Sequence, residues 1–92
     1  MKSNQTNWAL LTPVHQGAIA IIQLHGDDDT ALKNLTGKTN WSIGDMHLVS
    51  IASIDELIAV KLSDSLAQLM PHGGLQIIRA LSERFDSLGI EP

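Results

Sequence analysis

The chain has 92 residues, which is the length of one domain, and its composition excludes several classes of protein. Hydrophobic residues make up 43%, charged residues 17%, and the net charge is −4. That is enough apolar material for a core and too little charge bias for a disordered chain. Six scattered Lys and Arg residues and 3% aromatics argue against direct contact with nucleic acid. We therefore expect a single domain over 1–92, with 1–6 disordered.

Cysteine is absent, which excludes disulfides, thiolate nucleophiles and thiolate metal sites. The first residues lack the long apolar stretch of a secretory signal, and the longest apolar run, 18–22, is far too short to span a bilayer. These features predict a cytoplasmic protein that does not contact a membrane.

The N-terminal half of the sequence predicts two strands and a short helix. Residues 8–11 form a short apolar run. Residues 18–24 are rich in β-branched residues, and apolar side chains stand at both the odd and the even positions. This pattern predicts a strand buried on both faces. The aspartates at 27–29 provide N-cap chemistry for a helix over 28–35, with Gly37 as its C-cap.

The C-terminal half predicts three strands, over 46–53, 57–62 and 66–70, and then a longer helix over 74–88. That helix shows the clearest pattern, because apolar residues recur at helical spacing at Leu75, Ile78, Leu81, Phe85 and Leu88. The element order β-β-α-β-β-β-α predicts an α+β fold, with a mixed sheet and two helices packed on it.

No motif in the sequence supports catalysis or a metal site. The four histidines lack helical pairing, no phosphate-binding loop is present, and no serine stands in a nucleophile elbow. We expect no enzymatic activity, no metal and no bound GTP. The remaining local feature is the segment 71–74, Pro-His-Gly-Gly, between a strand and a helix. Its glycines would let a ligand approach the backbone beside free helix N–H groups, although an ordinary tight turn explains the same residues.

Two segments of the chain carry a resemblance to a known family. Residues 12–26 read TPVHQGAIAIIQLHG, and residues 64–74 read DSLAQLMPHGG before an amphipathic helix. They are similar to TPPGRGGIAVIRISG and EDVVEIxxHGG in the N-terminal domain of the tRNA-modifying GTPase MnmE (TrmE). The resemblance covers nearly the whole chain, but not the helical and GTPase domains of that family.

The resemblance implies a fold related to the tetrahydrofolate-binding domains of the aminomethyltransferase group, and a homodimer formed through this domain. In the family, a formyl-tetrahydrofolate derivative binds here as a one-carbon donor for wobble-uridine modification, while GTP is hydrolysed elsewhere. For this chain it implies a non-catalytic module that binds 5-formyltetrahydrofolate or a related folate. The expected partners are a second copy and the proteins of a tRNA-modification complex.

The positions that match the two motifs supply the expected cofactor-binding residues, which are His72, Gly73, Gly74, Asp64, Gln16 and Gln23. Gln16 and Gln23 stand where the family has arginine, so two charge-assisted partners for the folate carboxylates are lost. Asp64 keeps one acid of the family's TGED. Two hypotheses stay open: a module that binds folate weakly beside 72–74, and a diverged assembly module that has lost folate binding.

Overall fold

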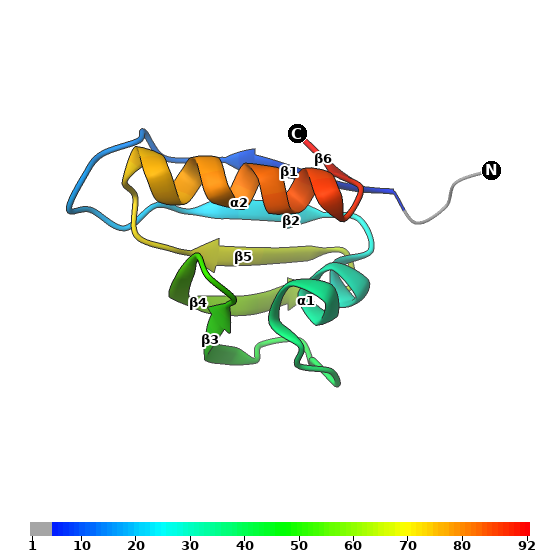
Figure 1. Cartoon of the computed structure of the whole chain (residues 1–92). Helices are drawn as coiled ribbons and strands as arrows, with labels where there is room; N and C mark the ends of the chain where they lie inside the picture. The colour runs from blue at the N-terminus through cyan, green and yellow to red at the C-terminus, as the bar shows by residue number, and fades with distance from the viewer. Residues whose placement is uncertain (1–4) are drawn as a thin grey trace.

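The computed structural model describes residues 5–92 as a six-stranded mixed sheet with two helices, a compact α+β domain (Figure 1). The elements in chain order are β1 (Thr6–Leu10), β2 (Ile22–His25), α1 (Asp28–Thr36), β3 (Met46–Ile51), β4 (Asp55–Ser63), β5 (Leu66–Met70), α2 (Leu75–Ser87) and β6 (Ile90–Glu91). This order confirms the predicted one and adds β6, a strand of two residues that is too short to show a periodic pattern. Within the described part of the chain, no helix is long and apolar enough to cross a membrane.

The strands are ordered β3-β4-β5-β2-β1-β6 across the sheet. All neighbouring pairs are antiparallel except β1 and β6, which run parallel and align Thr6 with Ile90. Thr6 is therefore part of a strand and is buried, because β6 covers the edge of β1. The prediction of disorder is wrong for this residue, and residues 1–4 lie outside the described part of the chain.

Both helices lie on the same face of the sheet, and the core fills the space between them and the strands (Figure 1). Along β2, Ile22 and Leu24 have no exposed surface, and Ala20 just before it is also buried. The alternate residue Ile19 is 57% exposed, and residues 21 and 23 are half-buried. The prediction that 18–24 is buried on both faces is therefore wrong. The apolar residues at the alternate positions, Ile19 and Ile21, point to a face of the sheet that neither helix covers.

Helix α1 begins and ends as the sequence predicted. The Asp27 carboxylate caps it by accepting a hydrogen bond from the Thr30 N–H at 3.2 Å. Gly37 ends it in the left-handed conformation, with φ 78°. The helix packs on the sheet through Ala31, Leu32 and Leu35, all of which are buried.

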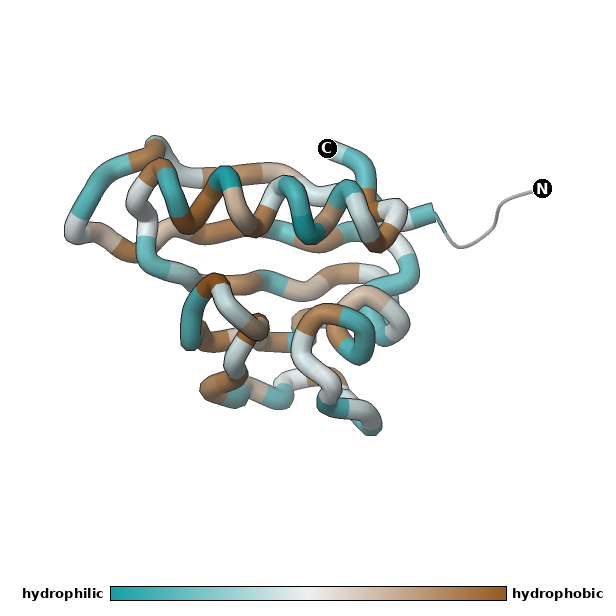
Figure 2. Tube along the Cα trace, in the orientation of Figure 1, coloured by the Kyte–Doolittle hydropathy of each residue, from teal (hydrophilic) through white to brown (hydrophobic). Residues whose placement is uncertain are grey.

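Helix α2 has polar and apolar residues alternating along its surface (Figure 2). It packs through Ile78, Leu81 and Phe85, as predicted. The centroids of the Phe85 and Trp8 rings lie 5.1 Å apart. Leu75 was expected in the same contact but is 55% exposed. This residue opens the first turn of the helix, where it lines a cavity beside Gln16 instead of packing on the strands.

Candidate functional site

The two segments that carry the family resemblance lie side by side in the structure. The His15 N–H donates to the Gly73 carbonyl at 3.0 Å, and the Gly73 N–H donates to the Ala18 carbonyl at 2.6 Å. Next to these contacts, on the side of the strands, Ile19 and His72 form an isolated antiparallel bridge. The antiparallel pairing of β2 and β5 thus continues past the ends of both strands. This extension positions residues 15–20 against 71–73.

Gly73 is required by the close approach of these two segments. A Cβ atom at this position would lie 3.0 Å from the carbonyl oxygens of both Ala18 and His15. Its own N–H is already bonded within the fold, so the backbone of Gly73 serves the packing of the chain. Gly74, in contrast, has open space where a Cβ would lie and forms the N-cap of α2.

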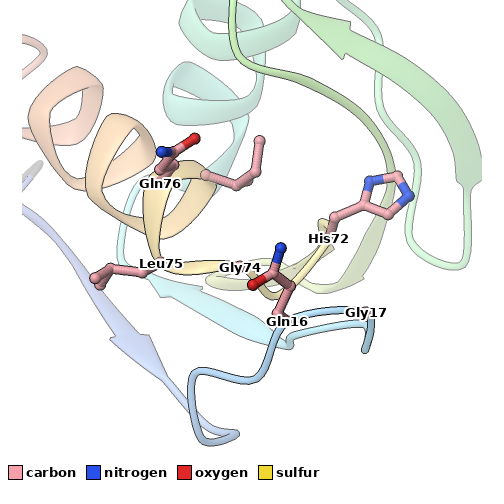
Figure 3. Close-up of a pocket in the computed structure, with 7 residues that line it drawn as sticks. Gln16, Gly17, His72, Gly74, Leu75 and Gln76 are labelled. Atoms are coloured by element: carbon pink, nitrogen blue, oxygen red, sulfur yellow. The ribbon is translucent and has the colours of Figure 1, made fainter.

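A cavity of about 450 Å³ opens where these segments meet the start of α2 (Figure 3). Its lining residues come from the 16–17 turn, from the 71–74 segment and from the first turn of α2; they are Gln16, Gly17, His72, Gly74, Leu75, Gln76 and Ile77. Figure 3 shows Leu75 pointing away from His72. None of the lining residues within the described range 5–92 is a Lys or Arg. The first turn of α2 holds no acidic residue and no side-chain cap, so its backbone N–H groups supply the positive potential of the site.

His72 is held in place by Asp55, a residue that the sequence did not indicate. The His72 N–H donates to Asp55 Oδ2 at 2.9 Å, and His72 Nδ1 lies 2.9 Å from Asp55 Oδ1. A carboxylate oxygen accepts, so the His72 Nδ1–H is the donor of this bond. The imidazole of His72 is 65% exposed and the Asp55 side chain only 10%. Asp55 is therefore an anchor within the fold, and His72 carries its polar ring toward solvent.

Three of the expected binding residues do not line this cavity: Gly73, which contacts residues 15 and 18 through its backbone, and Gln23 and Asp64, which lie elsewhere. Gln23 is in the middle of β2, opposite Ala9 and Gln68, and points to the face that the helices leave uncovered. Asp64 is in the turn between β4 and β5, at the other end of β5 from His72. The five residues of β5 alone separate these ends by roughly 17 Å at about 3.3 Å per residue. The structure thus brings together Gln16, His72 and Gly74, with Gly73 behind them, but not Gln23 or Asp64.

A second cavity of about 380 Å³ lies between α1 and the loop that follows it. Its lining includes Lys33 and the indole of Trp41, whose Nε1–H donates to the Lys38 carbonyl at 2.9 Å. Neither family-like segment reaches it. Among the described residues, no group of three or more His, Cys, Asp or Glu side chains could hold a metal ion.

Comparison with known proteins gives the chain no family: no protein-family model matches it, and no curated protein sequence matches it. The resemblance to the MnmE N-terminal domain rests on the residues of the two segments, and the geometry of the site has to be interpreted from its own residues.

Proposed function

We propose that the chain is a non-catalytic binding module that takes a tetrahydrofolate derivative in the cavity beside Gln16, His72 and Gly74. In this proposal it acts as a homodimer, with partner proteins, in the modification of tRNA wobble uridine. The observation that supports it is the convergence of the two family-like segments, which are far apart in sequence, on one cavity. The volume of about 450 Å³ is within the range of about 300–1,000 Å³ that small-molecule sites occupy.

The polar groups around the cavity suit the two ends of such a ligand. The amides of Gln16 and Gln76 both donate and accept, as the edge of a pterin ring requires. The uncapped first turn of α2 offers N–H groups to a carboxylate. A folate derivative carries both kinds of group on one molecule.

The position of Gln23 changes the affinity that we expect. Only Gln16 replaces a family arginine at the cavity, so a single charge-assisted hydrogen bond is lost there. Such a bond exceeds a neutral one by about 1–1.5 kcal/mol, which corresponds to roughly tenfold in affinity. We expect 5-formyltetrahydrofolate to bind weakly, in the high micromolar range.

Calorimetric titration of 5-formyltetrahydrofolate into the 92-residue chain tests this proposal. Gln16→Arg should tighten binding about tenfold because it restores a guanidinium at the cavity. Gln23→Arg is the matched control and should leave the dissociation constant unchanged, because residue 23 lies on another face. Absence of binding by all three proteins at near-millimolar ligand would rule out the folate module. An equal gain from both variants would place the ligand elsewhere.

A diverged assembly module that has lost folate binding is the second candidate. It is favoured by the absence of any Lys or Arg among the lining residues and by the distance of Gln23 and Asp64 from the cavity. This candidate predicts a chain that forms dimers and gives no binding heat with the folate, so mass measurement and titration together separate the two.

A further inference from the structure

The sheet has one face that no other element covers within residues 5–92. In β4 the side chains of Leu57, Ala59 and Lys61 point to the core, so the alternate residues point away from both helices. Strand pairing aligns neighbours on this second face, with Leu48 beside Ile58 and Ile58 beside Met70. We define the uncovered face by its central residues, which are Ile19, Ile21, Gln23, Met46, Leu48, Ile58, Val60, Leu62, Gln68 and Met70.

Large apolar side chains on this face are exposed to solvent. Leu48 is 65% exposed, Met46 60% and Ile19 57%, while Leu62 and Ile58 are 41% and 38% exposed. Their contiguity over β3 and β4 separates them from the scattered apolar residues found on any protein surface. Contiguous apolar faces of this kind mark an interaction site.

The charges around the uncovered face decide what can cover it. Among the described strand residues, no Lys or Arg side chain points to this face, and its acidic residues, Glu56 and Glu91, lie at the ends of their strands. An anionic membrane surface or a nucleic acid would require basic residues here. A second copy of the chain meets no like charge at the centre of the face.

The polar residues at the centre also suit a second copy. Gln23 and Gln68 are paired in register between β2 and β5. An amide side chain both donates and accepts, so it can bond to the same residue of another copy across a two-fold axis. A face built around Lys or Glu could not do so.

The area of the uncovered face can be compared with that of a standard dimer interface. The four strands β2 to β5, about 4.8 Å apart and about 17 Å long, cover roughly 330 Å² in plan, and projecting side chains make the accessible area larger. A standard interface removes about 800 Å² from each partner. In plan the uncovered face is less than half of this area, so a stable dimer would also bury the loops and strand ends around it.

We propose that the uncovered face is the interface of a homodimer in which two copies pack sheet against sheet, with Ile58 and Met70 near the two-fold axis. Two sheets packed in this way lie about 10 Å apart, and their side chains form a shared apolar layer. The proposal rests on the homodimer of the proposed function and names its surface.

Sedimentation equilibrium of the full chain, from low to high micromolar concentration, tests the surface. Leu48→Glu replaces an exposed residue, so each protomer should fold as before, as circular dichroism would verify. The variant should raise the dimer dissociation constant at least tenfold, because it places carboxylates in the apolar layer. Leu75→Glu is the matched control: Leu75 is similarly exposed, at 55%, but lies on the helical side, and its variant should remain as dimeric as the wild type.

The absence of cysteine from the sequence allows a second, independent test. Ile58→Cys should give a disulfide-linked dimer on mild oxidation, because two copies of residue 58 would lie close to the axis. Leu75→Cys should give far less of it under the same conditions.

The outcomes separate the surface from the function. A wild-type dimer that Leu48→Glu leaves intact would overturn the assigned surface while keeping the homodimer. A wild-type chain that stays monomeric at high micromolar concentration would overturn both. Folate titration is independent of these results, so a dimer without ligand binding would retain the surface and reject the folate module.

Discussion

At the scale of single residues, the most consequential contact is an ion pair inside the fold. Lys61 Nζ lies 3.0 Å from Asp28 Oδ2 and 2.9 Å from Asp29 Oδ1. The side chains of Lys61 and Asp28 are 4% and 1% exposed, whereas Asp29 is 65% exposed. Asp28 Oδ1 has no hydrogen-bond partner among the described residues, so the charge of Asp28 depends on Lys61. The contact links α1 to β4.

The surroundings of Lys61 favour its charged form. Burial of the ammonium acts to lower the pKa of Lys61, but hydrogen bonds to Asp29 and Asp28, and the attraction of their charges, outweigh it. The pKa of Lys61 is therefore raised above its ordinary value of 10.5. The resulting stabilisation is fully present below pH 10.5 and is lost as the pH rises through the raised pKa.

Lys61→Met should destabilise the protein by about 3–5 kcal/mol at pH 7, because it leaves the buried Asp28 carboxylate unpaired. Urea unfolding would measure the loss. The double variant Lys61→Met/Asp28→Leu removes both buried charges and should recover most of it. It should also lack the wild type's decline in stability above pH 10.5. A loss below about 1 kcal/mol for Lys61→Met would contradict this account of the pair.

At the scale of elements, α2 shows how position along a helix decides which apolar residues are buried. Leu81 has no exposed surface, while Leu75, six residues earlier on the same predicted stripe, is 55% exposed. At about 100° per residue, the six residues between them turn Leu75 about 120° around the helix axis from Leu81, so Leu75 lies at the edge of the stripe. This direction, together with the place of Leu75 in the first turn beside residues 16–17 and the cavity, leaves its side chain exposed.

Leu81→Ala should therefore cost about 2–5 kcal/mol of stability, while Leu75→Ala should change it by about 0.5 kcal/mol or less. The two variants make the same chemical change in the same helix, so each controls for the other. The free energies of unfolding in urea would compare them. Equal losses would mean that the first turn of α2 packs on the sheet after all.

At the scale of the whole molecule, the charges are arranged against binding of nucleic acid. The net charge is −4, and Lys61 is buried in its ion pair. Arg84 donates to the Ala52 carbonyl at 3.1 Å, and the Lys38 ammonium lies 5.6 Å above the ring of Trp41. The exposed basic residues of the described chain form no continuous stripe that could follow a phosphate backbone.

The isolated chain should therefore not retard tRNA in a gel at about 50 mM salt, even at about 100 μM protein, because it cannot release enough counterions to bind. Fluorescence anisotropy with a labelled anticodon stem-loop would give the same answer in solution. Binding that weakens steeply with added salt would show a basic surface that the charge distribution does not provide. If such binding were observed, the chain could hold tRNA itself, and a role in tRNA modification would not require a partner protein for that purpose.

Much of the fold was predictable from local patterns. Helix α1, with its Asp27 cap and Gly37 end, follows from side-chain chemistry within a few residues. Strand β5 lies where its residues predicted it, over Leu66–Met70. The site was predictable only in part: Gln16, His72 and Gly74 meet at one cavity, but Asp55 gave no signal because its contact with His72 arises from the pairing of β4 with β5.

By itself, the sequence determined every element except β6, their order and the α+β class, because capping residues, glycines and hydrophobic periodicity act between residues close together in the chain. The tertiary structure decided which faces those elements share. It placed both helices on one side of the sheet, which left Leu48 on the uncovered face and turned Ile19 from expected core into exposed surface. It also separated Gln23 and Asp64 from His72, because strand register, and not spacing along the chain, determines which side chains meet.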